Sequence, residues 1–304
     1  MDDESVAYAA CGRSAIRDAA GDGMLDAELL TNAICRGINW WLAMKSKQNL
    51  VKRIMENGKA VIIPMDHGVS EGPIQGLEDI CSMVKEVEKY ATAVILHKGM
   101  VKALTKRPAC GLILHGSAST RVALDPNFKA QVATPREAVG MKCHGFSLHI
   151  NIGGSEREPE MLVALGKAAE ECDLLGLPLL AMMYPRGKNI TKVSPDDIAL
   201  VARVGAELGA DIVKCPYSGD TASFKRVVSG CPVPVVIAGG AKADSDRGIL
   251  KAVAGAMDAG AMGVSLGRNV FQHRNPGKMV HAVREIVINN AGVKDALEIL
   301  NEAK

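Results

Sequence analysis

From about residue 58 onward, short runs of apolar and β-branched residues alternate with longer segments in which apolar residues recur every three or four positions. The short runs have the composition of buried strands, and the longer segments have the spacing of helices with one apolar face. Eight runs end in polar residues or glycine: AVIIPMDHG, TAVILHKG, CGLILHGS, GFSLHINIGG, PLLAMMYPRG, ADIVKCPYSG, VPVVIAGG and MGVSLGRN. Eight strands alternating with helices over roughly 250 residues predict a (β/α)8 barrel. The alternative is an open doubly wound sheet, which more often has about five or six strands.

Residues 1–57 precede the first predicted strand, so we expect an N-terminal helical extension there and a barrel domain over residues 58–304. The segment AELLTNAICRGINWWLAMKSKQNLVKRIM has helical spacing and contains both tryptophans. It either plugs the bottom of the barrel or packs on a neighbouring subunit. The stretch from Cys110 to Thr134 is the least regular part of the pattern, with one strand and a long polar loop.

The composition narrows the range of partners. The 304 residues carry a net charge of +2 and only 3% aromatic residues, so we expect no nucleic acid as partner. No apolar run reaches the roughly 20 residues that span a bilayer, and the acidic N-terminus differs from a secretory signal. None of the 8 cysteines forms a C-x-x-C pair. We therefore expect reduced thiols, no membrane partner and a cytoplasmic location.

The active site of such a barrel lies at the carboxyl ends of its strands, so the last residues of each run are the informative ones. They are rich in ionisable and polar groups and in glycine: Asp66, His67, His97, Lys98, His115, His149, Asn151, Tyr184, Arg186, Lys214, Tyr217, Gly239, Gly240, Lys242, Gly267, Arg268 and Asn269. A barrel built for stability alone does not need this many ionisable groups at one rim. The ring of polar groups therefore predicts an enzyme.

Lys214 follows the apolar pair Ile212 and Val213 directly, so it belongs to a strand rather than to a loop. Burial and neighbouring cations favour the neutral form of an amine, and a neutral amine can attack a ketone to form a Schiff base. The alternative is a lysine whose amine reaches solvent or pairs with an acid.

Glycines and cations follow the seventh and eighth runs, in AGGAK and LGRN. The loops at these two strands frequently form the phosphate site of a barrel, and backbone N–H groups beside cations suit a phosphate dianion. Gly239, Gly240, Lys242, Gly267 and Arg268 are therefore candidate phosphate ligands. The alternative is that the glycines only supply tight turns.

The strand-end histidines, His67, His97, His115 and His149, support a rival hypothesis, a zinc-dependent aldolase or hydrolase. Neither an H-x-H nor an H-E-x-x-H spacing occurs in the chain. A metal would also make the lysine redundant as an electron sink. We therefore expect the histidines to bind substrate hydroxyls or buried carbonyls, and we expect no metal.

Seven motifs occur in order over about residues 45–290: VIIPMDHGVSEGPIQGL, AVILHKG, MMYPRGK, LGADIVK, YSGD, AGGAK and VSLGRNVFQH. Together they resemble the archaeal-type class I aldolases, which include class I fructose-bisphosphate aldolases and 2-amino-3,7-dideoxy-D-threo-hept-6-ulosonate (ADH) synthases. The resemblance implies that Lys214 forms the Schiff base, Tyr184 donates a proton and Asp66 accepts one. The residues matching segments that hold the phosphorylated sugar are Asp66, His67, Gly68, Val69, Ser70, Tyr184, Pro185, Arg186, Gly239, Gly240, Gly267 and Arg268.

The resemblance also implies a phosphorylated ketose and an aldehyde as substrates, no cofactor beyond the imine, and a large homo-oligomer, commonly a decamer. Fructose-bisphosphate aldolases of this type carry tryptophan two residues before the active tyrosine, where this chain has Met182. The motif MMYPRG is similar to that of ADH synthases, which use 6-deoxy-5-ketofructose 1-phosphate and L-aspartate 4-semialdehyde in a route to 3-dehydroquinate and aromatic amino acids. Fructose-1,6-bisphosphate aldolase is the alternative. A metal-dependent aldolase, a non-catalytic sugar-phosphate binder and an acyl-transferring thiolase are more distant hypotheses.

Overall fold

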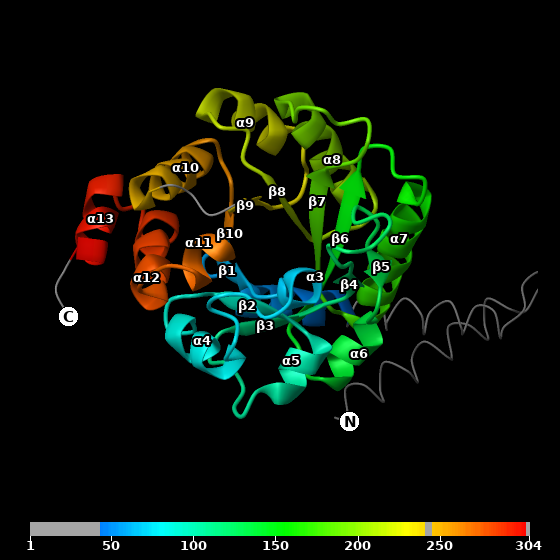
Figure 1. The fold of residues 1–304 in the computed structure, drawn as a ribbon, viewed down its shortest axis with the longest axis horizontal. Coiled ribbons are helices and arrows are strands. Elements are labelled where there is room, and N and C mark those ends of the chain that lie inside the picture. Colours follow the sequence, from blue (N-terminus) through cyan, green and yellow to red (C-terminus); the bar gives the residue numbers. More distant parts are fainter. Residues whose placement is uncertain (1–42, 241–244, 302–304) are drawn as a thin grey trace, which may run out of the picture.

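The computed structural model describes residues 43–240 and 245–301, and its centre is a closed barrel of parallel strands (Figure 1). The order around the barrel is β1-β10-β9-β8-β7-β6-β3-β2. The barrel strands are β1 (Ala60–Pro64), β2 (Ala93–His97), β3 (Gly111–His115), β6 (Gly145–Ile152), β7 (Leu179–Pro185), β8 (Ile212–Pro216), β9 (Val235–Ala238) and β10 (Gly263–Ser265). Each lies within one of the eight runs found in the sequence, so the predicted (β/α)8 fold is confirmed.

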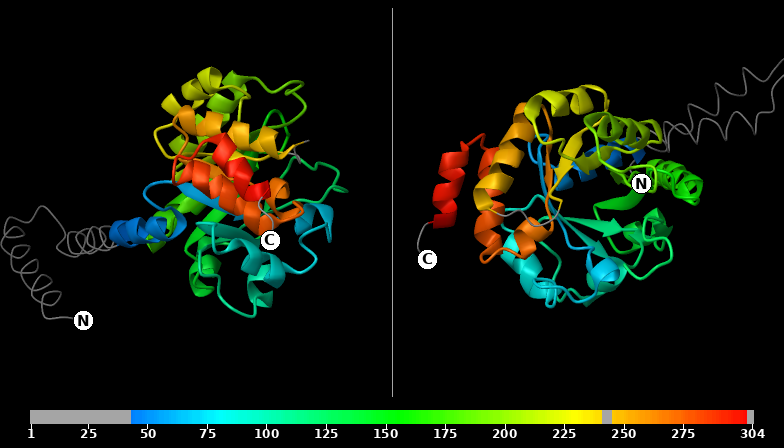
Figure 2. Two further views of the ribbon diagram at one scale, coloured as in Figure 1. Left: turned by 90° about the vertical axis from the view of Figure 1, so that its left-hand side faces the viewer. Right: turned by 45° about the horizontal axis from the view of Figure 1, so that its top comes forward.

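Helices surround the barrel (Figures 1 and 2). They are α3 (Gly68–Glu71), α4 (Ile80–Val87), α5 (Lys98–Ala103), α6 (Pro135–Gly140), α7 (Glu158–Leu175), α8 (Pro195–Glu207), α9 (Thr221–Ser229), α10 (Asp246–Asp258), α11 (Arg268–Phe271), α12 (Pro276–Val287) and α13 (Val293–Asn301). The longer ones, such as α7, α8, α10 and α12, cover the outer face of the barrel strands (Figures 1 and 2). The short α3 follows the carboxyl end of β1, and α13 packs on α10 and α12. Thr134 and Ser194 cap α6 and α8 with capping boxes. In each, the hydroxyl oxygen accepts from the backbone N–H three residues on, and the carboxylate of that later residue accepts from the backbone N–H of the capping residue.

Successive residues of each strand point alternately into the barrel and outward to the helices. In β7, Leu180 and Met182 belong to the apolar cluster inside the barrel, whereas Ala181 and Met183 belong to the cluster beneath the helices. The same alternation runs through the other strands. It determines which strand-end residues can face the barrel mouth.

The connection between β3 and β6 contains a small antiparallel ribbon outside the barrel. Its strands are β4 (Ser117–Ala118) and β5 (Ala130–Gln131). The irregular stretch of sequence therefore contributes one barrel strand, as expected, and a ribbon that the sequence did not indicate. Strands of two residues are too short to show a hydrophobic period.

A helix over residues 43–54 lies at the end of the barrel where the strands begin, opposite their carboxyl ends (Figure 2, left, blue). Ile54 and Met55 pack into the apolar cluster inside the barrel. Lys47 is 6% exposed and binds Asp173 and Asp211, which precedes β8, at 2.5 and 2.8 Å. For residues 43–55 the structure thus agrees with a plug at the bottom of the barrel. The rest of the expected extension, residues 1–42, lies outside the described residues.

Within the described ranges, no helix has both the length and the apolar character needed to cross a bilayer. The cysteines placed by the structure are free thiols: Cys81, Cys110, Cys143, Cys172, Cys215 and Cys231.

Candidate active site

A cavity of about 210 Å³ lies at the carboxyl ends of the strands. Its wall consists of Pro64, Asp66, His67, Ser70, Glu71, Lys129, His149, Met182, Tyr184, Arg186, Lys214, Gly239, Gly240, Ser265, Gly267 and Arg268. The three candidate catalytic residues, Lys214, Tyr184 and Asp66, therefore line one cavity. So do most of the candidate substrate-binding residues.

Some candidates lie elsewhere. Gly68 and Val69 belong to α3 and do not line the cavity, and the Val69 side chain is 38% exposed. Pro185 is buried at the end of β7, one position past the inward-facing Tyr184. Lys242 lies outside the described residues.

The cavity wall also includes Lys129, Glu71 and Ser265, which the sequence did not single out. Ser265 is an inward residue of β10, so the alternation along that strand could have identified it. Lys129 precedes the two-residue strand β5 in the irregular connection, where the sequence contains no register signal.

Lys214 occupies an inward position of β8 and is 5% exposed. Its Nζ lies 3.9 Å from the sulfur of Met182, which is its partner in the register between β7 and β8. Among the residues that the structure describes, no carboxylate lies within 4.0 Å of this amine. The amine thus neither reaches bulk solvent nor pairs with an acid, which were the two alternatives to a reactive lysine.

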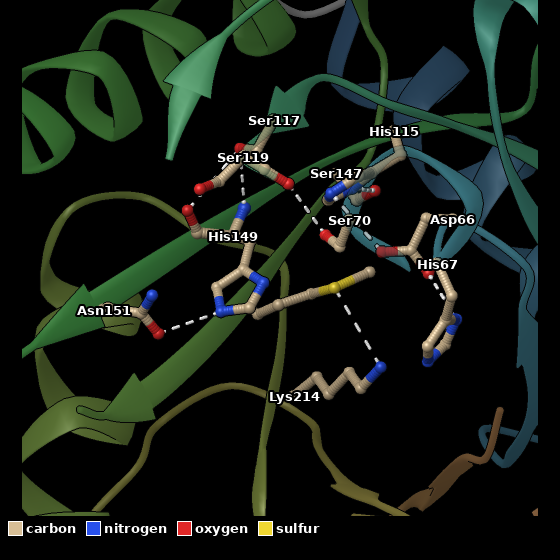
Figure 3. A network of polar contacts seen from close by, with 11 residues as sticks. Asp66, His67, Ser70, His115, Ser117, Ser119, Ser147, His149, Asn151 and Lys214 are labelled. Atoms are coloured by element: carbon tan, nitrogen blue, oxygen red, sulfur yellow. Dashed lines mark hydrogen bonds and ion pairs between the residues drawn. The ribbon is translucent and has the colours of Figure 1, made fainter. Parts of the chain in front are cut away.

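Asp66 lies between His115 and His67 (Figure 3). Its Oδ2 is 3.5 Å from His115 Nε2, and its Oδ1 is 3.5 Å from His67 Nδ1. On the far side of its ring, His115 Nδ1 lies 2.8 Å from the hydroxyl of Ser147. This hydrogen bond fixes the orientation of the imidazole that faces the carboxylate.

The electrostatic environment favours ionised Asp66. Burial opposes the charge, but the electrostatic interactions with His115, His67 and Lys214 outweigh it and hold the pKa of Asp66 well below its ordinary value. Burial lowers the pKa of His115 to about 4, against the opposing influence of Asp66. At neutral pH, the site therefore contains a carboxylate beside a neutral imidazole.

The ring of Tyr184 packs against the side chains of His149 and Arg186. Its ring centre lies 4.7 Å from that of His149 and 4.3 Å from the guanidinium carbon of Arg186. His149 Nε2 contacts the amide oxygen of Asn151 at 2.9 Å (Figure 3). Burial lowers the pKa of His149, and the nearby charges of Lys129 and Arg186 lower it further. His149 is thus also neutral at neutral pH.

The loops after β9 and β10 are joined by hydrogen bonds. Asn269 Nδ2 donates to the carbonyl of Gly239 at 2.9 Å, and Arg268 Nη2 donates to that of Gly240 at 3.2 Å. A Cβ at Gly267 would lie 2.6 Å from the His67 ring, so only glycine fits there without displacing that ring. Both loops contribute to the cavity wall, in the place where phosphate binds in many barrels.

Four buried side-chain atoms have no hydrogen-bond partner among the described residues: Asp66 Oδ1, His67 Nδ1, Ser265 Oγ and Arg268 Nε. All four residues line the same cavity. Buried polar groups in native proteins are nearly always satisfied, so unsatisfied ones concentrated in one cavity indicate a polar ligand.

Three of the strand-end histidines, His67, His115 and His149, contact aspartate, serine or asparagine side chains. The ring of the fourth, His97, packs edge-on against that of His115 at 5.0 Å. Over the described part of the chain, no group of three or more His, Cys, Asp or Glu side chains has an arrangement that could hold a metal ion.

A buried lysine at the mouth of a (β/α)8 barrel is the arrangement found in enzymes that form a Schiff base, among them the Schiff-base aldolases. The model of the DeoC/LacD aldolase family matches residues 60–273, and the chain belongs to that family. It is an enzyme of the aldolase type.

Two relatives are ADH synthases. ADH synthase 1 of Archaeoglobus fulgidus is 43% identical over 257 residues, 84% of this chain and 96% of the relative. ADH synthase of Halobacterium salinarum is 40% identical over 249 residues, 81% of this chain and 93% of the relative. The 2-amino-4,5-dihydroxy-6-oxo-7-(phosphonooxy)heptanoate synthase of Streptomyces griseus is 39% identical over 77% of this chain and 86% of its own.

Among solved structures, an archaeal fructose-1,6-bisphosphate aldolase superimposes with a TM-score of 0.74 at 28% identity. The match covers 79% of this chain and 99% of that one, in which the catalytic lysine is covalently bound to the carbinolamine intermediate of the substrate.

Proposed function

We propose that the protein is a Schiff-base transaldolase that acts on a phosphorylated ketose, and specifically an ADH synthase. The observation that carries the proposal is the buried Lys214 amine, which lines one cavity together with Tyr184 and Asp66. The relatives at 40–43% identity support the specific activity.

In the proposed reaction the neutral amine of Lys214 attacks the ketone carbon of the substrate, and the carbonyl oxygen takes up a proton to give a carbinolamine. Loss of water leaves a protonated imine. Removal of a proton from the hydroxyl group on the second carbon from the imine carbon then breaks the bond between the first and second carbons. The electrons of that bond move into the imine. An aldehyde leaves, and an enamine remains bound to the lysine.

The enamine then attacks the carbonyl carbon of L-aspartate 4-semialdehyde, whose oxygen takes up a proton. Addition of water to the resulting imine releases the product and regenerates the amine. Tyr184 is the proposed proton donor, since a phenol can exchange protons with both the carbinolamine and the aldehyde oxygen. Asp66, held as a carboxylate by its surroundings, is the proposed proton acceptor.

Fructose-1,6-bisphosphate aldolase is the second candidate, because solved structures of aldolases with that substrate superimpose on this chain. Two observations favour ADH synthase. The ADH synthases are more similar in sequence, at 40–43% identity, than these structures, at 28–29%. Met182 contacts the Lys214 amine. It also occupies the position at which fructose-bisphosphate aldolases of the archaeal type carry tryptophan.

The proposed chemistry uses the imine as electron sink and requires neither a metal nor an organic cofactor. The substrate phosphate is proposed to bind the two loops that contain Gly239, Gly240, Gly267 and Arg268, with Lys242 close in sequence. We also propose a cytoplasmic homo-oligomer, which rests on the family resemblance alone.

The test is reduction with borohydride in the presence of 6-deoxy-5-ketofructose 1-phosphate. We expect a stable adduct on Lys214 by peptide mass spectrometry, and ADH formation when aspartate semialdehyde is supplied. A Lys214→Arg variant that retains turnover would refute the imine mechanism. Efficient cleavage of fructose 1,6-bisphosphate without ADH formation would instead reverse the order of the two candidates. Activity that a chelator abolishes and borohydride spares would indicate a metal-dependent aldolase.

A further inference from the structure

Lys129 lines the cavity but has no place in the chemistry described above. It lies in the connection between β3 and β6, immediately before β5. Its Nζ donates to the carbonyl of Pro126 in its own loop at 3.0 Å, and its backbone N–H contacts the sulfur of Met161. The contact with Met161 joins the loop to α7, and the Nζ contact lies within the loop.

The charge of Lys129 is not neutralised by a carboxylate. Within residues 43–240 and 245–301, no carboxylate oxygen lies within 4.0 Å of its Nζ. The acid in the same loop, Asp125, instead accepts hydrogen bonds from Ser155 Oγ at 2.6 Å and from the Asn127 N–H at 2.9 Å. Burial lowers the pKa of Lys129, and the charge of Arg186 lowers it further. Asp66 and Asp125 oppose this effect from a greater distance, so Lys129 and Arg186 are two cations that influence each other electrostatically.

The barrel order separates these two cations from the proposed phosphate loops. Arg186 follows β7, and Lys129 belongs to the connection that leads to β6, whereas the glycine loops follow β9 and β10. Lys214 is on β8, between the two groups. The cavity therefore has a cationic region on each side of the reactive amine.

The proposed role of Tyr184 indicates which substrate reaches this second region. An aldehyde whose oxygen contacts the Tyr184 hydroxyl has its remaining atoms near Arg186, since that guanidinium stacks on the Tyr184 ring at 4.3 Å. Lys129 influences the same neighbour, His149, whose ring also packs on Tyr184. Aldehydes that carry a carboxylate or phosphate would place their anion there.

We infer that Lys129, together with Arg186, binds the anionic group of the aldehyde substrate and selects anionic over uncharged aldehydes. The inference rests on the proposed function, because it assumes an imine at Lys214 and an aldehyde at Tyr184. It assigns to the β3–β6 connection a specificity role that neither the motifs nor the family match indicates.

The test compares Lys129→Met and Lys129→Arg with the wild-type enzyme. For Lys129→Met we expect the KM for L-aspartate 4-semialdehyde to rise about 10- to 100-fold, the factor for loss of one charge-assisted hydrogen bond. Lys129→Arg keeps the charge and is expected to restore most of the affinity. Borohydride trapping of dihydroxyacetone phosphate or hydroxyacetone on Lys214, which needs no aldehyde, is expected to be unchanged in both variants.

Lys188→Met is the matched control. Lys188 lies near Arg186 in the chain, is exposed and lies 3.8 Å from Glu156, but it does not line the cavity. Removing its charge is expected to leave the KM within about twofold of wild type, because exposed ion pairs contribute little. An unchanged KM in Lys129→Met, an equal loss in Lys129→Arg, or a parallel loss of imine trapping would each overturn the inference.

Failure of the proposed function would be seen separately, in the wild-type enzyme. If the wild type makes no product from aspartate semialdehyde, the same variants are tested with D-glyceraldehyde 3-phosphate, whose anion is a phosphate. The ratio of variant to wild-type KM then decides the role of Lys129, whichever aldehyde the enzyme uses.

Discussion

Tyr184 and Lys214 line the same cavity because both occupy inward positions of neighbouring strands. Met182 and Lys214 are register partners between β7 and β8, and Tyr184 is the next inward residue after Met182. Since side chains alternate along a strand, moving either residue by one position would turn it toward the helices.

We predict that Tyr184→Phe lowers kcat at least about 100-fold, because general acid–base catalysis by a positioned side chain typically contributes this much. Phenylalanine keeps the packing against His149 but removes the hydroxyl. The measurement is the rate of ADH formation, with the midpoint of urea unfolding as a check that the fold is intact. Activity within a few-fold of wild type would exclude the proposed role.

A second residue-scale prediction concerns the hydroxyl behind Asp66. Ser147→Ala removes the partner of His115 Nδ1, so the imidazole facing the carboxylate loses its fixed orientation. We expect kcat to fall about tenfold, as for loss of one positioning hydrogen bond, with a smaller change in KM. Ser229→Ala, which removes an exposed hydroxyl on α9, serves as control. Equal kcat values in the two variants would show that His115 needs no such support.

The sequence was sufficient for residues whose position follows from a strand end. Asp66, Tyr184 and Lys214 come at or just after the ends of clear apolar runs, and the structure brings them to one cavity. The sequence was insufficient for Lys129. This residue lies in an irregular connection, where no alternation of apolar and polar residues shows which side chains face the cavity. The contact between Met182 and Lys214 depends on strand register, which a single sequence does not specify.

At the scale of elements, ion pairs of Lys47 add to the apolar contacts that fix the helix over residues 43–54 to the barrel. This lysine bridges Asp173 in α7 and Asp211 before β8, and Asp211 also accepts from the Leu179 N–H at 2.7 Å. One side chain therefore joins the plug, a helix and the starts of two strands.

We predict that Lys47→Met lowers the free energy of unfolding by about 2–3 kcal/mol, because it leaves the carboxylates without their cation. The expected loss of stability is smaller than for a fully buried ion pair, because the Asp173 side chain is 45% exposed and water weakens its interaction with Lys47. Urea or thermal unfolding provides the measurement. Lys52→Met, an exposed lysine of the same helix, is expected to change stability by less than about 0.5 kcal/mol. Similar effects of the two substitutions would rule out a special role for Lys47.

The elements themselves were largely predictable, since eight runs of suitable length correspond to eight barrel strands. The ribbon of β4 and β5 was not, because its short strands depend on tertiary contacts such as the hydrogen bond from His149 N–H to Ser117 Oγ. Whether a helical segment packs on its own barrel or on another subunit also depends on contacts that the sequence does not state.

At the scale of the whole molecule, the buried histidines link stability to pH. Burial lowers the pKa of His67, His97, His115 and His149 below the ordinary value of 6.5. Between that value and the folded pKa, the unfolded chain binds more protons than the native one. Acidification through this window therefore favours unfolding.

For His115 the window runs from 6.5 to about 4, so its full contribution is about 3 kcal/mol, most of it lost between pH 7 and 5. We predict that the free energy of unfolding is lower at pH 5 than at pH 7 by at least about 2 kcal/mol. Urea titrations at the two pH values measure it. In His115→Asn the difference is expected to shrink correspondingly. A wild-type stability that does not fall between pH 7 and 5 would contradict the prediction. The lowered pKa of Asp66 has no influence here, since its contribution is lost only below about pH 4.

The division of the cavity wall between strands and connections has a consequence for how such enzymes diversify. Lys214 and Tyr184 belong to the barrel lattice, whereas Lys129 and Arg186 lie just beyond it. Insertions and exchanges in a connection leave the lattice undisturbed. A descendant of this chain could therefore acquire a different acceptor by remodelling residues 116–130 while inheriting its carbon–carbon bond chemistry unaltered.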